Sequence, residues 1–245
     1  MNVTRAQSRQ MLRHLSRDLK SLYQNLDESA IRAIQQHEVQ GNHVSCRQGC
    51  DACCHIAVVI TKVEAMVIAD RIHSWPDWRE WPARLASAAQ PYCAPEYDRN
   101  WYANARPPCP FLAEHQCRIY DIRPAPCRYY YVITPAEQCG DRVHLEVGQL
   151  DMTEIEMRVL AYSNSVMGEF TASCLPLMVL EAMINVGWSC GREHQITPAT
   201  AGLPSPMKWM ADCIGRDTDK DLGQDQAVRR AWTKLKAIGL PGTEG

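Results

Sequence analysis

The amino-acid sequence predicts a mainly α-helical protein, in which a helical domain surrounds a cysteine-rich, loop-dominated metal-binding centre with a small β-hairpin. Three observations favour this fold class. Apolar residues recur at helical spacing near the N-terminus, and helical patterns return in the C-terminal part. Cysteines and prolines concentrate between them, where regular periodicity is lost. We expect one compact unit of three regions: an N-terminal helix over 1–40, a cysteine-cluster region over 41–139 and a helical region over 140–245.

The first predicted element is a helix over residues 4–38. Its leucines alternate at spacings of three and four, which places them on one face: Leu12, Leu15, Leu19, Leu22 and Leu26. The pattern lasts only about two heptads, which favours packing on the rest of the chain over a coiled-coil dimer. Asp27 to Ser29 is a candidate interruption, and we expect Ile31 and Ile34 to continue the apolar face.

A short buried strand is predicted over Ile56 to Ile60. Thr61 and Glu64 then have capping-box spacing and open a helix that ends near His73. A short helix over Ala83 to Ala89 interrupts an otherwise irregular, tryptophan-rich connection, and residues 104–139 show little helical pattern. Four further helices are expected in the C-terminal part: Thr153–Phe170, Pro176–Gly187, Pro206–Ile214 and Gln224–Ile238.

Composition limits the partners. The chain of 245 residues carries 26 Lys+Arg against 28 Asp+Glu, a net charge of −2 that disfavours nucleic acid and anionic membranes as partners. The N-terminal residues show no apolar segment of the kind found in signal peptides, and the apolar runs are too short to cross a bilayer. We therefore expect a cytoplasmic protein that does not enter a membrane.

Seven of the 12 cysteines fall into two groups, and the first group is Cys46, Cys50, Cys53 and Cys54. Clustered thiolates are typical of zinc and iron–sulfur sites, and without an export signal they favour metal over disulfides. On a continuous helix the four sulfurs would spread over about 12 Å, too far to share one ion at about 2.3 Å. Hence the backbone bends at Gly49, the centre holds more than one ion, or other cysteines complete it.

The second group is Cys109, Cys117 and Cys127. Two short apolar stretches joined by the polar residues 114–116 predict a hairpin that presents Cys109 and Cys117 on one side. Pro124 and Pro126 restrict the backbone before Cys127. Seven cysteines suit one four-thiolate site with three spare, two ions with a bridging sulfur, or one cluster with additional redox-active thiols.

The motif Cys-x3-Cys-x2-Cys-Cys, then Cys-Pro-Phe-Leu, then Cys-x-Ile-Tyr-x-x-Arg-Pro-x-x-Cys-Arg resembles a bacterial cysteine-cluster family of zinc- or iron-chelating domains. The resemblance covers Cys46 to Arg128 and includes all seven cysteines, which it implies as metal ligands. The flagellin lysine methylase carries a similar cluster and modifies protein lysines. The resemblance therefore allows an enzyme role.

The metal is either an iron–sulfur cluster (4Fe–4S) or zinc. Structural zinc sites often include His, whereas every position of this motif is Cys, and we lean towards iron–sulfur. His55 and His115 are candidate extra ligands, although a hydrogen-bonding role beside the centre is more common. Cys139 is a candidate eighth ligand. The other cysteines read as small buried apolar residues: Cys93, Cys174, Cys190 and Cys213.

Two weaker patterns accompany the cysteines. Arg106, Arg118, Arg123 and Arg128, followed by three tyrosines, suit an anionic ligand or RNA, but compensation of thiolate charge is the preferred interpretation. The spacing of Cys46, Cys50 and Cys53 also occurs in radical S-adenosylmethionine enzymes. That class is disfavoured because Cys54 follows at once and the strand–helix alternation of its barrel is missing.

The sequence thus predicts a metal-binding protein whose seven-cysteine centre serves a structural or interaction module, with an unidentified protein or small-molecule partner. The alternative is an iron–sulfur enzyme, either a redox protein or a methyltransferase-like catalyst that modifies proteins. Folding of the loop region should depend on the metal, since empty thiolates leave it without a core.

Overall fold

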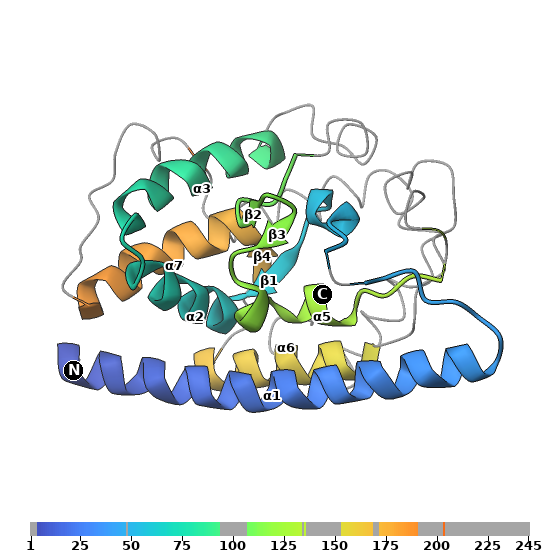
Figure 1. Cartoon of the computed structure of the whole chain (residues 1–245). Helices are drawn as coiled ribbons and strands as arrows, with labels where there is room; N and C mark the ends of the chain where they lie inside the picture. The colour runs from blue at the N-terminus through green and yellow to red at the C-terminus, as the bar shows by residue number, and fades with distance from the viewer. Residues whose placement is uncertain are drawn as a thin grey trace, which may run out of the picture.

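The computed structural model describes residues 4–47, 49–93, 107–133, 135, 153–168, 172–190 and 203. Helices dominate this part of the chain, which confirms the mainly α-helical fold class with a small hairpin. The long helix α1 (Arg5–Val39) lies along one side of the molecule, and α6 (Thr153–Met167) runs beside it (Figure 1). The helices α2 (Lys62–His73) and α7 (Leu175–Cys190) pack on each other above α1.

The leucine face of α1 is the face that packs on the molecule. Leu12, Leu15, Leu19 and Leu26 are buried, as the sequence predicts. The helix continues through Asp27 to Ser29 without interruption. The prediction for Ile31 is wrong, because this side chain is 54% exposed and Ala30, one residue earlier, occupies the buried face. At 100° per residue, Ala30 follows Leu26 by one turn and Ile31 falls to the side.

Two strand–helix units form the centre of the fold. Strand β1 (Val59–Thr61) leads directly into α2, and β4 (Ala172–Cys174) leads directly into α7. The two strands are antiparallel, with Val59 opposite Cys174 and Thr61 opposite Ala172. Strand β1 is shorter than the strand predicted over Ile56 to Ile60, and it begins three residues later. The predicted capping box of α2 is present, with the Thr61 side chain and Glu64 bonded reciprocally.

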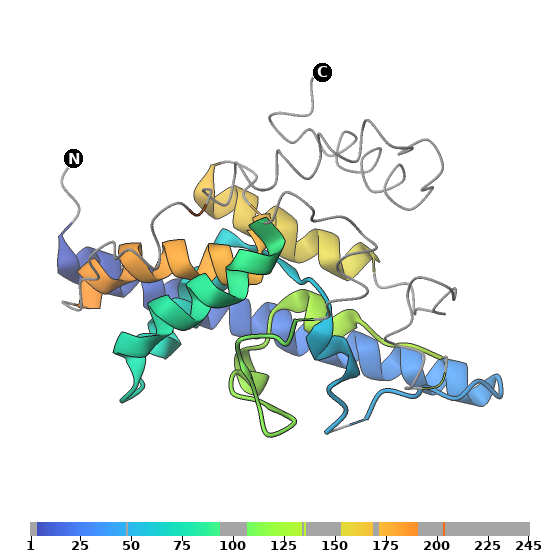
Figure 2. The same ribbon diagram turned by 90° about the horizontal axis from the view of Figure 1, so that it is seen from above.

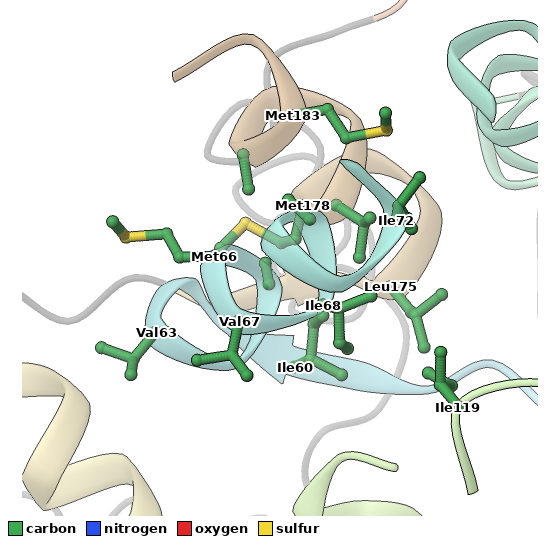
Figure 3. Close-up of a cluster of buried hydrophobic side chains, with 14 of the residues drawn as sticks. Ile60, Val63, Met66, Val67, Ile68, Ile72, Ile119, Leu175, Met178 and Met183 are labelled. Carbon is green, nitrogen blue, oxygen red and sulfur yellow. The ribbon is translucent and has the colours of Figure 1, made fainter. Parts of the chain in front are cut away.

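The main core lies between α2 and α7 and extends to α1. Figure 3 shows side chains of this core from α2 (Met66, Ile68 and Ile72), from α7 (Leu175 and Met178) and from β1 (Ile60). The same core cluster includes residues of α1, α3 (Trp81–Ala89) and α6. The division into regions 1–40, 41–139 and 140–245 stays a prediction.

The predicted helices of the C-terminal part are found where the structure describes them. The helix expected over Thr153–Phe170 is α6, and the helix expected over Pro176–Gly187 is α7. The helices expected over Pro206–Ile214 and Gln224–Ile238 lie outside the described residues. Among the helices that are described, none has the length and apolar character that a bilayer crossing requires.

Candidate metal centre

The first cysteine group lies on a bent loop that ends in a short 3-10 helix, η1 (Ala52–His55). The chain turns at Gly49, whose φ of +83° falls in the left-handed region that glycine adopts without strain. Backbone hydrogen bonds from Cys50 to Arg47 (3.1 Å) and from Cys54 to Asp51 (2.8 Å) close the next two turns. The four cysteines are therefore not spread along one helix, in agreement with a bend at Gly49, the first of the three alternatives.

The second group begins on the predicted hairpin, formed by β2 (Leu112–Ala113) and β3 (Gln116–Cys117). Its two-residue turn holds Glu114 and His115 at φ of 49° and 61°, the left-handed values that a tight hairpin requires at both positions. His115 Nδ1 lies 2.7 Å from Asp51 Oδ2, and this hydrogen bond lowers the pKa of Asp51. His115 thus acts as a hydrogen-bonding neighbour that ties the hairpin to the first group.

Phe111 anchors the hairpin to the helical body. Its ring is fully buried and stacks on Trp81, with ring centroids 5.0 Å apart. The backbone N–H of Cys109 donates a 2.7 Å hydrogen bond to the carbonyl oxygen of Cys54. Figures 1 and 2 show η1 and the hairpin side by side as a result. The two cysteine groups are therefore one structural unit.

Cys127 belongs to a short helix, α5 (Ala125–Tyr129), which the sequence pattern does not reveal. The prediction of little helical structure over 104–139 is wrong here, because Pro124 and Pro126 suit a helix start as well as a loop. Arg128 holds the helix in place with a nearly buried guanidinium. It donates to Asp27 of α1 (2.7 Å) and to the carbonyl oxygens of Arg123 and Asp121 (2.7 Å each).

Electrostatic interactions connect five thiols from these three segments, and we call them the five-thiol group: Cys53, Cys54, Cys109, Cys117 and Cys127. A hydrogen bond between the sulfurs of Cys53 and Cys54 lowers the pKa of Cys53 and raises the pKa of Cys54. Burial raises the pKa of Cys117 and Cys127, and it raises the pKa of Cys109 to about 12. A metal must therefore displace protons from this group, and its affinity will fall as the pH falls.

Arg123 supplies positive charge to the five-thiol group. Its charge lowers the pKa of Cys53 and opposes the increases at Cys117 and Cys127. Its Nε is buried and has no hydrogen-bond partner within the described part of the chain. A thiolate or sulfide ligand would satisfy such a donor.

The other arginines of the motif have different partners. Arg118 donates to Asp77 (3.0 Å), and Arg128 donates to Asp27. Both guanidinium groups are thus paired with carboxylates. Arg106 lies outside the described residues. Among the motif arginines that the structure describes, the charge compensation expected from the sequence therefore rests on Arg123.

The remaining candidate ligands are not part of the five-thiol group. Cys46 Sγ lies against the backbone just after α5, 3.4 Å from the nitrogen of Val132 and 3.9 Å from the oxygen of Tyr130. Cys50 lies on the loop before η1. His55 ends η1, and Cys139 lies outside the described residues. Of the scattered cysteines, Cys174 is fully buried in β4, as expected for a small apolar residue, whereas Cys93 is half-buried.

The thiols of the five-thiol group do not form a closed site for a single metal ion. Across the described ranges, no three or more His, Cys, Asp or Glu side chains are arranged to hold one metal ion. A tetrahedral zinc ion needs thiolate sulfurs about 3.8 Å apart, since each Zn–S bond is about 2.3 Å. One ion would thus require the side chains to move closer together, whereas in a four-iron cluster each thiolate binds a different iron.

Residues 45–146 match the model of a family described as "CxxCxxCC: Putative zinc- or iron-chelating domain". This segment is similar to that domain over 102 of the 245 residues. The match confirms the resemblance read from the motif and supports metal binding through a cysteine cluster. It includes all seven cysteines, whereas α1, α6 and α7 lie outside it. Searches of curated proteins and of solved structures find no match to the chain.

Proposed function

We propose that this chain binds a metal centre through the seven motif cysteines, with the five-thiol group as its main ligand set, and that the centre fixes the cysteine-rich loops to the helical body. One observation carries the proposal. Three segments that are distant in sequence bring five thiols together, and the charge of Arg123 acts on three of them, Cys53, Cys117 and Cys127. The buried Nε of Arg123 has no hydrogen-bond partner among the described residues. A group of soft ligands with a buried positive charge suits a thiolate metal centre.

The residues fit an iron–sulfur cluster better than a single zinc ion. Among the described residues the thiols are not arranged to share one ion, whereas the four thiolates of a four-iron cluster each bind a different iron. Cys46 and Cys50, on the loop that turns at Gly49, would complete the set. The bound centre would supply a cross-link between η1, the hairpin and α5. Zinc stays the alternative.

The proposed role is a structural or interaction module, with a protein or a small molecule as partner. The fixed loops lie on one side of the helical body and end in the exposed tip of the hairpin, where His115 is 81% exposed. A metal-fixed loop surface of this kind can present a stable contact site to a partner. The cytoplasmic location stays a prediction.

The experiment compares two cysteine substitutions in the full chain, purified without air and analysed for bound metal. Cys127→Ser removes a ligand of the five-thiol group and should reduce bound metal to a small fraction of the wild-type amount. Cys93→Ser replaces a half-buried cysteine outside the motif and should leave bound metal unchanged. Equal metal contents of wild type and Cys127→Ser would contradict the proposed ligand set.

A further inference from the structure

A buried carboxylate lies behind the five-thiol group. Glu64, in the first turn of α2, is 1% exposed and accepts four hydrogen bonds. Oε2 accepts from the backbone N–H (2.8 Å) and the hydroxyl (2.9 Å) of Thr61. Oε1 accepts from the hydroxyl of Tyr23 (3.0 Å) and from the backbone N–H of Ala125 (2.7 Å). Only the Oε2 contacts belong to the capping box of α2.

The contact with Ala125 caps a different helix. Ala125 is the first residue of α5, and the preceding Pro124 has no side-chain acceptor with which to cap it. Glu64 therefore supplies the N-terminal cap of α5 from α2. A helix of five residues has little stability of its own, so its position depends on such contacts.

The cap lies two residues before a candidate metal ligand. The N–H of Cys127 donates to the carbonyl oxygen of Pro124 (2.9 Å), within the turn that the Glu64 contact starts. Tyr23 links the same carboxylate to α1, and the Arg128 guanidinium lies 4.1 Å above the Tyr23 ring. The backbone that carries Cys127 is thus fixed to α1 and α2 at its first residue and again at Arg128.

We propose that Glu64 is a positioning residue for the metal centre: through its hydrogen bond to Ala125 it fixes the place of Cys127 in the five-thiol group. This inference rests on the proposed function. Glu64 acts through the backbone of α5 and touches no ligand sulfur. Partners that orient a metal ligand typically affect metal affinity by 10–100-fold.

The test compares Glu64→Gln with Thr61→Ala in the full chain. Glutamine keeps the shape of the side chain but replaces one acceptor oxygen by a donor, so the contacts of Thr61 and Ala125 cannot both be kept. Thr61→Ala weakens the capping box of α2 and leaves the oxygen that faces Ala125 in place. Tyr23→Phe, which removes one donor to that oxygen, serves if Glu64→Gln does not fold.

Bound metal is challenged with a chelator, and the melting temperature is measured in parallel. Glu64→Gln should weaken metal retention by about tenfold or more, whereas Thr61→Ala should lower the melting temperature with unchanged retention. Tyr23→Phe should weaken retention by a smaller factor. Equal retention by Glu64→Gln and Thr61→Ala at matched loss of melting temperature would show that Glu64 is only a helix cap.

A second readout separates this inference from the proposed function. If wild type holds no metal, the proposed function fails, and the positioning role is decided on the metal-free protein. There, Glu64→Gln should raise the alkylation rate of Cys127 several-fold, and Thr61→Ala should not. Equal alkylation rates in the two variants would overturn the positioning role.

Discussion

The backbone N–H of Cys109 donates a 2.7 Å hydrogen bond to the carbonyl oxygen of Cys54. This contact joins the first cysteine group to the hairpin segment, which carries Cys109 and Cys117 of the second group. It uses main-chain atoms of two candidate ligands, so their relative position is set by the backbone as well as by any metal. The hairpin can then be loosened by substitutions distant from the sulfurs.

Phe111→Ala should separate docking of the hairpin from general stability. The buried Phe111 ring stacks on Trp81, so its loss should lower the free energy of unfolding by about 3–5 kcal/mol and release bound metal. Leu85→Ala, at a fully buried position of α3, should cost about 2–5 kcal/mol with little loss of metal. Urea unfolding and metal analysis test the pair, and equal metal loss in both variants would contradict the docking role of Phe111.

Arg123→Gln should make Cys53 less reactive in the metal-free protein. The Arg123 charge lowers the pKa of Cys53, and the first unit of pKa regained reduces the thiolate fraction at pH 7 about fivefold. The matched variant Arg118→Gln removes a guanidinium that is bonded to Asp77 and should leave Cys53 unchanged. Alkylation rates resolved by peptide mapping test this, and identical rates in the two variants would exclude the role of Arg123.

Arg128→Ala should destabilise the protein far more than Arg71→Ala. Arg128 is 4% exposed and bonds Asp27 and two carbonyl oxygens, so its loss should cost about 2–4 kcal/mol. The Arg71–Asp121 pair is exposed and should contribute less than about 1 kcal/mol. Denaturant unfolding of both variants gives the comparison. Similar losses of unfolding free energy in the two variants would mean that Arg128 does not fix α5.

The ion pair of Asp77 with Arg118 predicts a specific pH dependence. The hydrogen bond from Arg118 lowers the pKa of Asp77 below its ordinary value of 3.8. The contribution of this ion pair to the free energy of unfolding is therefore fully present above pH 3.8. It is lost as the pH falls through the lowered pKa of Asp77. The difference in unfolding free energy between wild type and Asp77→Asn should be constant from about pH 7 to pH 5 and shrink in stronger acid. A difference that does not change with pH would contradict this.

Patterns within one segment could be predicted from the sequence. The leucine spacing locates the buried face of α1, and the Thr61–Glu64 spacing marks the start of α2. The hairpin follows from two apolar stretches around a polar turn. These features depend on neighbours in the sequence, so periodicity and capping rules suffice.

Long-range pairing could not be predicted in the same way. The strand β4 has three residues, and only its pairing with β1 makes it a strand. The second role of Glu64 depends on Ala125, which belongs to a five-residue helix without a periodic signal. For the same reason, the motif arginines could not be sorted into Arg123, whose charge acts on the Cys53 thiol, and Arg128, which bonds Asp27.

The most direct test of the metal centre is elemental analysis combined with an ultraviolet–visible spectrum of the full chain purified without air. We expect brown protein with several irons per chain and broad absorption from thiolate-bound iron. Colourless protein with stoichiometric zinc would keep the cysteine centre and replace the cluster by zinc. Protein without stoichiometric metal, its cysteines joined in disulfides, would contradict the central claim.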